Sequence, residues 1–76
     1  MVFEKVCKIL ADQFGVAENS LNMDTAFIED LGADSLDLYQ IILGVEDAFD
    51  IEIPQEEAEK IVTVGDAVEL IQRVVE

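Results

Sequence analysis

The chain has 76 residues, of which 18 are acidic and four are basic, giving a formal net charge of −14. This length predicts one small domain, residues 1–76, and a hydrophobic content of 51% excludes a disordered chain. Such a negative field excludes nucleic acid and anionic membranes as favourable partners and favours proteins with lysine and arginine patches.

The sequence has no segment that predicts membrane insertion. No apolar run approaches the roughly 20 residues needed to span a bilayer, and the N-terminus lacks a basic region followed by an apolar segment. We therefore expect a cytoplasmic monomer, or a protein of an organelle matrix if a transit peptide has been removed. The lone cysteine, Cys7, excludes an internal disulfide framework.

The first predicted helix ends near Phe14. Gly15 then provides a left-handed C-cap, with Val16 placed for the accompanying hydrophobic contact. The apolar residues before it recur at spacings of three and four, the period of one helical face: Phe3, Val6, Cys7, Leu10 and Phe14. Cys7 falls on this apolar face, so we expect a buried thiol and not a reactive one.

Residues 17–33 are polar and have no sustained period. We expect a long ordered loop with one helical turn, attached to the core by Phe27 and Leu31. A loop of this length in so small a domain is uncommon unless it is functional. It ends at Ser35, the start of the next helix.

The second predicted helix runs from Ser35 to about Asp50. Asp34 is a good N-cap, and Asp37 three residues later completes a capping-box pattern. At about 100° per residue, one broad face is apolar and predicts the core side: Leu38, Ile41, Ile42, Val45, Ala48 and Phe49.

The opposite face of this helix carries apolar residues that core packing does not require. These are Leu36, Tyr39 and Leu43, beside the polar residues Gln40, Glu46, Asp47 and Asp50. They are either isolated exposed side chains, which are common, or an apolar docking strip with an acidic rim. An acidic rim steers association while a small apolar contact permits release.

The last third of the chain predicts two further helices. Pro54 ends the preceding segment, residues 55–61 allow a short helix, and Thr63 with Asp66 repeats the capping-box pattern. An apolar stripe then continues to the end: Val64, Ala67, Val68, Ile71, Val74 and Val75. The predicted fold is all-α, a small four-helix bundle of three longer helices and one short helix, with a long ordered loop between the first two.

Ser35 is the candidate site for chemistry, but not as a catalytic nucleophile. A nucleophilic serine needs a general base and oxyanion donors, whereas this chain has no histidine and places Asp30, Asp34 and Asp37 around Ser35. We therefore expect no enzyme activity. The N-terminus of a helix favours a phosphate, so Ser35 is either an attachment point or only an aid to capping.

The acidic content also raises the possibility of a calcium-binding or interaction module. An EF-hand loop starting at Asp30 would place Gly32 at position three and Ser35 at position six, where a ligand and a glycine are required. This pattern predicts no metal site. We expect only weak, incidental binding of divalent cations, at Asp30, Asp34 and Asp37 or at Glu46, Asp47 and Glu52.

Residues 27–37, Phe-Ile-Glu-Asp-Leu-Gly-Ala-Asp-Ser-Leu-Asp, resemble the attachment signature of the acyl carrier proteins of dissociated (type II) fatty acid synthesis. Residues 46–50, Ile53-Pro54, residues 56–61 and Thr63-Val64 continue this resemblance over nearly the whole chain. The resemblance implies that Ser35, flanked by Asp34 and Leu36, carries 4'-phosphopantetheine transferred from coenzyme A, and that fatty acyl chains are held on it as thioesters.

The resemblance also implies the partners and the remaining site residues. A phosphopantetheinyl transferase, malonyl transferase, ketoacyl synthases, reductases, dehydratase and acyltransferases would dock through basic patches. The docking positions are Asp34, Leu36, Asp37, Tyr39, Leu43, Glu46 and Asp47, and the acyl-chain cavity would involve Phe27, Val45, Ile53, Ala58, Ile61 and Ala67. Carriers of D-alanyl, aminoacyl or polyketide groups share this fold and cofactor, so they remain an alternative.

Three residues depart from the family pattern. Gln40 stands where many relatives carry a glutamate, and Tyr39 stands where a smaller aliphatic residue is frequent. Gly44 lies inside a predicted helix, where glycine costs about 1 kcal/mol relative to alanine unless it permits a close approach. These departures bear on partner preference and not on Ser35.

Overall fold

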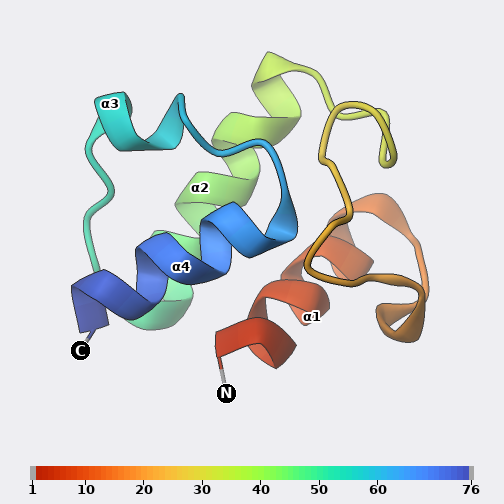
Figure 1. The fold of residues 1–76 in the computed structure, drawn as a ribbon, viewed down its shortest axis with the longest axis horizontal. Helices are drawn as coiled ribbons and strands as arrows, with labels where there is room; N and C mark the ends of the chain where they lie inside the picture. The colour runs from red at the N-terminus through yellow and green to blue at the C-terminus, as the bar shows by residue number, and fades with distance from the viewer. Residues whose placement is uncertain (1, 76) are drawn as a thin grey trace.

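The computed structural model describes residues 2–75, which form an all-α bundle (Figure 1). Its helices are α1 (Val2–Phe14), α2 (Ser35–Phe49), α3 (Gln55–Ala58) and α4 (Val64–Val75), with a 3-10 turn, η1 (Glu18–Ser20), after α1. The four-helix architecture expected from the sequence is therefore confirmed. One isolated antiparallel bridge, Ala26 with Thr63, is the β pairing found within the described residues.

Three longer helices enclose the core. α1 packs against both α4 and α2, and Figure 1 shows α3 at one edge of the molecule, on the opposite side from the long loop. The largest fully buried side chains come from all three helices and from the long loop: Val6, Leu10, Phe27, Ile41, Val45, Val64 and Ile71. Burial of these aliphatic and aromatic groups is the main source of stability in a domain of this size.

The long loop is ordered by backbone hydrogen bonds to the segment that leads into α4. Phe27 N donates to Val62 O at 3.0 Å, and Gly65 N donates to Met23 O at 2.8 Å. Phe27 is buried and Leu31 packs partly buried against the core, as the sequence predicted. The expected helical turn is η1. The start of α2 is thus held by a fixed loop.

Local signals at the helix ends were mostly accurate. Gly15 adopts a left-handed conformation with φ of +69° and follows α1 directly, while Val16 packs against the core. The end of α2 lies at Phe49, with Asp50 as a left-handed C-cap at φ 54°. Glycine tolerates this conformation without a Cβ penalty, and Asp is one of the few other residues that adopt it routinely.

Three expectations about the faces and lengths of helices were wrong. The short helix ends at Ala58 and not at Ile61, because Lys60 N and Ile61 N donate to carbonyls three residues back, which tightens the chain and turns Ile61 into the core. Ala48 is exposed on α2. Val74 and Val75 are exposed because the last turn of α4 extends beyond the packed part of the helix, whereas Leu70 is buried.

Candidate functional site

The loop delivers Ser35 through a closed turn that depends on one glycine. Ala33 N donates to Phe27 O at 3.0 Å and Gly32 N donates to Ile28 O at 3.1 Å, with Gly32 at φ +70°. The hydrogen bond from Gly32 N spans four residues and is that of an αL motif, with Gly32 in the left-handed position, while the bond from Ala33 N spans six residues and closes a wider turn. Asp30 supports the turn because its Oδ2 accepts from Ala26 N at 2.7 Å. The residues before Ser35 therefore have a defined path.

Two carboxylates cap α2 and leave the Ser35 hydroxyl outside the cap. Asp37 N donates to Asp34 Oδ1 at 2.9 Å, and Asp34 N donates to Asp37 Oδ2 at 3.2 Å, which is the reciprocal capping box predicted from the sequence. Ser35 is exposed as the first residue of the helix. Its side chain is available at a position where free amide groups and the helix dipole favour a phosphate.

An apolar strip follows Ser35 along the exposed side of α2. Leu36, Tyr39 and Leu43 are exposed to 64%, 61% and 46%, as the helical wheel predicted. Asp47 is also exposed, while Asp37 and Glu46 are half-buried. We call Leu36, Tyr39 and Leu43 the α2 strip. Its three apolar side chains need no partner within the chain, so they are free to contact another protein.

A groove of about 560 Å³ lies between α2 and α3 and begins at Ser35. Its α2 wall is made by Ser35, Leu38, Tyr39, Ile42, Leu43 and Glu46, and its other wall by Ile53, Gln55, Ala58 and Glu59. The helical wheel predicted Leu38 and Ile42 as core residues, and no pattern in the sequence pointed to Gln55 or Glu59 as groove residues. The spacing of Leu38 and Ile42, three and seven residues after Ser35, was the available signal.

The six residues predicted for an acyl-chain cavity lie in different places. Ile53 and Ala58 line the groove. Phe27, Val45 and Ala67 are buried in the core, and Ile61 is buried at its α3 side. The groove and the core thus share a boundary at Ile53, which is itself buried.

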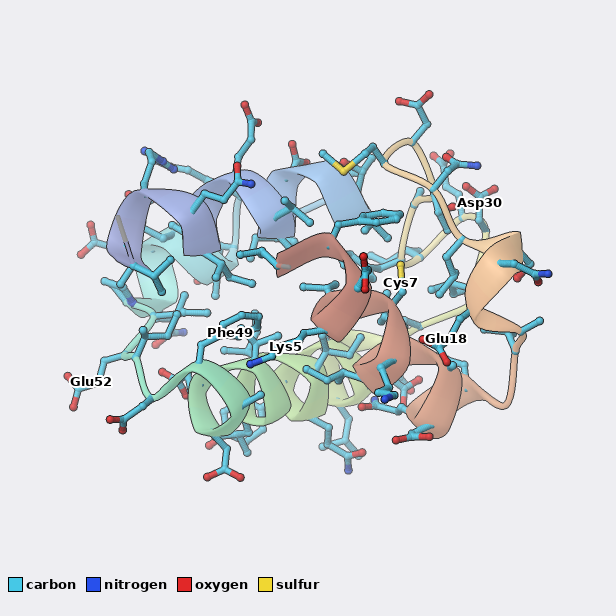
Figure 2. The ribbon with its side chains drawn as sticks, turned by 90° about the horizontal axis from the view of Figure 1, so that it is seen from below. Lys5, Cys7, Glu18, Asp30, Phe49 and Glu52 are labelled. Carbon is cyan, nitrogen blue, oxygen red and sulfur yellow. The ribbon has the colours of Figure 1, made fainter. Side chains whose placement is uncertain are left out.

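The segments that form this site carry acidic residues and no basic ones. Residues 9–59 contain fourteen acidic residues and no lysine or arginine. Lys5 is directed elsewhere, with its Nζ 5.3 Å from the centre of the Phe49 ring (Figure 2). Within residues 2–75, no group of three potential His, Cys, Asp or Glu ligands is placed to hold a metal ion.

Cys7 is inside the bundle, as expected for a small hydrophobe. Burial raises the pKa of its thiol, and the negative charges of Glu18 and Glu4 raise it further. Figure 2 shows Cys7 on α1, with Glu18 in the adjoining turn. A buried thiol with a raised pKa is a poor nucleophile, so the chemistry of this chain does not lie there.

Comparison with known proteins decides which family has this arrangement. Residues 4–71 match the family model described as a phosphopantetheine attachment site. The chain is 54% identical over 72 residues to an acyl carrier protein of Clostridium acetobutylicum, covering 95% of this chain and 94% of that one. The chain belongs to the acyl carrier protein family. A solved structure of a proposed acyl carrier protein from Mycobacterium tuberculosis superposes with a TM-score of 0.90 at 30% identity, over 96% of this chain and 97% of that one.

As an acyl carrier protein, the chain carries acyl groups on 4'-phosphopantetheine. The residues present fit that group, because an exposed serine hydroxyl at a helix N-terminus adjoins a partly apolar groove that can accept a flexible arm and an acyl chain. Carrier proteins of this family bring intermediates to other proteins and are not themselves catalysts. Among the described residues, no helix has the length and apolar character needed to cross a membrane.

Proposed function

We propose that Ser35 is the residue to which 4'-phosphopantetheine is attached, flanked by Asp34 and Leu36. The observation that carries this proposal is the position of Ser35 at two features at once, the N-terminus of α2 and the mouth of the groove. Asp34 and Asp37 satisfy the helix cap by themselves. The serine hydroxyl is therefore not needed for capping and is free to form a phosphodiester.

The bound arm would supply a terminal thiol, on which acyl groups are held as thioesters. The chain itself contributes an anchor, an amide-rich helix end that favours the phosphate, and an apolar groove beside it. Tethering raises the effective concentration of the intermediate at each partner, since the intermediate is never released to dilute solution.

We also propose that an acyl chain enters the groove between α2 and α3. Ile53 and Ala58, which line the groove, would contact it first, together with Leu38 and Ile42. Phe27, Val45, Ile61 and Ala67 would form the deeper part of the cavity when the chain pushes into the core. Apolar contact with the groove would shield the thioester end of the chain from water.

The α2 strip is the proposed docking surface for the enzymes of fatty acid synthesis. Apolar contact would come from Leu36, Tyr39 and Leu43, and charge from Asp34, Asp37, Glu46 and Asp47. A phosphopantetheinyl transferase, malonyl transferase, ketoacyl synthases, reductases, dehydratase and acyltransferases would meet this surface through basic patches. We place the protein in the cytoplasm as a monomer, with residues 1–76 as a single acyl carrier domain that has no enzyme activity of its own.

The attachment is tested by mass. The protein is incubated with coenzyme A, magnesium and a phosphopantetheinyl transferase, and its intact mass is measured before and after. Wild type should gain one phosphopantetheine group, and Ser35→Ala should gain none. Ser20→Ala, which removes another exposed serine, should be modified like wild type. A mass gain that persists in Ser35→Ala would exclude Ser35 as the anchor.

The kind of carrier is tested by loading. The modified protein is offered to a malonyl transferase with malonyl-coenzyme A, and separately to an aminoacyl-adenylating enzyme with D-alanine and ATP. Malonyl loading without aminoacyl loading is the expected result for fatty acid synthesis. The reverse pattern would assign the chain to the aminoacyl carriers.

A further inference from the structure

We propose that Glu46 is a positioning residue, which holds the α3 wall of the groove in place, and that it is not primarily a docking charge. This inference rests on the proposed role of the groove. Glu46 was counted above among the docking charges of α2. If its carboxylate is engaged in the groove wall, the docking charge at this position is supplied by the neighbouring Asp47.

Residues 50–54 connect α2 to α3, and we call them the connector. Glu46 accepts hydrogen bonds from the connector with both its backbone carbonyl and its side chain. Its carbonyl oxygen accepts from Asp50 N and from Ile51 N, the latter at 3.1 Å. Its carboxylate Oε2 accepts from Ile53 N at 2.7 Å. The last of these is a short, charge-assisted hydrogen bond in a half-buried setting, which is the stronger kind.

The α3 wall has no comparable hydrogen-bonded support of its own. α3 is four residues long, and its backbone hydrogen bonds are local, from Ala58 N to Pro54 O and from Glu59 N to Gln55 O. Within residues 2–75, no hydrogen bond joins α3 to another helix. After α3 the chain is held by the buried Ile61 and by the hydrogen bond from Phe27 N to Val62 O, and before α3 it is held by the connector, which is attached to α2 at Glu46.

Ile53 links this attachment to the groove. Its amide is the donor to Glu46, and its side chain lines the groove and is buried against the core. The Glu46 side chain lines the same groove. One hydrogen bond thus fixes the residue at the boundary between groove and core, so its loss should loosen the groove without unfolding α1 or α4.

The neighbouring acidic side chains do not share this arrangement. Asp47 is exposed, and no described residue donates a hydrogen bond to its carboxylate. Glu52, within the connector, is directed away from the body of the protein (Figure 2). Among the acidic residues of this region, Glu46 is the one whose carboxylate accepts a backbone hydrogen bond, so Asp47 provides a matched control of similar charge and adjacent position.

The test is amide hydrogen exchange by NMR on the unmodified protein, with variants Glu46→Ala, Glu46→Gln and Asp47→Ala. In Glu46→Ala, exchange of the Ile53 amide should rise by about tenfold or more, since hydrogen bonds to charged groups are the more stabilising ones. Glu46→Gln keeps an acceptor oxygen but loses the charge, so exchange of the Ile53 amide should lie between the rates of wild type and Glu46→Ala. Amides of Leu10 and Ile71 report whether the bundle as a whole has changed.

A second measurement tests whether an acyl chain contacts the groove at Ile53. Ile53 methyl shifts are compared between unmodified protein and protein that carries an octanoyl group on the arm. The shift on loading should be reduced in Glu46→Ala and retained in Glu46→Gln and Asp47→Ala. Association with a phosphopantetheinyl transferase at low salt should be slowed more by Asp47→Ala than by Glu46→Gln.

The proposal is overturned if Ile53 exchanges equally in wild type and Glu46→Ala, or if Asp47→Ala has the same effect as Glu46→Ala. It is also overturned if Glu46→Gln slows association more than Asp47→Ala, because Glu46 would then act chiefly as a docking charge. The exchange experiment needs no attached group. A failure of Ser35 to gain mass would therefore be a separate result, and would not affect this one.

Discussion

Two glycines show that the effect of a glycine-to-alanine substitution on stability depends on the atoms around the added methyl group. Gly65 N donates to Met23 O, and a Cβ at Gly65 would lie 2.9 Å from that same oxygen. A Cβ at Gly44 would lie 3.4 Å from Cγ2 of Ile9 on α1, at the lower edge of ordinary contact. The close approach anticipated at Gly44 is therefore modest, whereas Gly65 is required by the attachment of the long loop.

These contacts predict opposite outcomes for two alanine substitutions. Gly65→Ala should reduce the free energy of unfolding by about 1–3 kcal/mol, because the backbone of the loop must shift. Gly44→Ala should be neutral, or should stabilise by up to about 1 kcal/mol through helix propensity. Urea unfolding followed by circular dichroism measures both. Equal destabilisation by the two substitutions would contradict the contacts described.

At the scale of elements, reciprocal caps determine where α2 and α4 begin. At α4, Thr63 Oγ1 accepts from Asp66 N at 3.2 Å, while Asp66 Oδ2 accepts from Val62 N at 3.0 Å and Thr63 N at 3.1 Å. The backbone hydrogen bonds from Val62 and Thr63 hold the pKa of the Asp66 carboxyl below its ordinary value. The same residues precede α4 and pair with the long loop, so this cap also supports the loop.

The lowered pKa of Asp66 predicts how stability depends on pH. A carboxyl with a lower pKa in the folded state than in the unfolded state stabilises fully above the unfolded value of about 3.9. That contribution is lost as pH falls through the folded-state pKa. The difference in unfolding free energy between wild type and Asp66→Asn should therefore be largest near neutral pH and should shrink on acidification.

Denaturant unfolding at several pH values between about 6 and 3 measures this difference. Glu69→Gln, which removes an exposed carboxylate from the same helix, controls for the loss of one negative charge. A difference between wild type and Asp66→Asn that stayed constant over this range would show that the cap does not depend on the charge of Asp66.

At the scale of the whole molecule, charge and packing act against each other. A net charge of −14 on 76 residues repels itself in the compact state, while the core is limited by the size of the domain. A negative field of this kind favours association with basic surfaces, which is the role proposed for the acidic residues of α2. Under that proposal, the excess of acidic residues promotes association and lowers stability.

This balance predicts stabilisation by salt. The thermal midpoint should rise between low ionic strength and about 0.15 M, where the screening length is about 8 Å. A gain of about 1 kcal/mol would appear as a shift of roughly 4–8 °C. A variant that neutralises three exposed residues, Asp47→Asn, Glu52→Gln and Glu56→Gln, should respond less. A midpoint that does not rise with salt would argue against self-repulsion.

Much of this structure follows from local sequence, because local hydrogen bonds produce it. The cap at Asp34, the left-handed Gly15 and the exposed α2 strip depend on residues within one or two turns, and each was predictable. The end of α3 was not predictable from local sequence, because Ile61 packs in the core against residues that are distant along the chain. Ala48 and Val75 were misassigned for a related reason: a helical wheel gives the direction of a side chain but not whether another element lies there.

The sequence by itself determined the helical class, the capped start of α2 and the candidate anchor Ser35, since all three rest on neighbours along the chain. The presence of the groove and the proposed role of Glu46 could be recognised only in the tertiary structure. Those features arise where the connector after α2 folds back, so that the Glu46 carboxylate meets the Ile53 amide and α3 faces Leu38 and Ile42. Contacts between separate elements depend on how the chain packs, and helical periodicity does not predict them because it describes only the faces of a single helix.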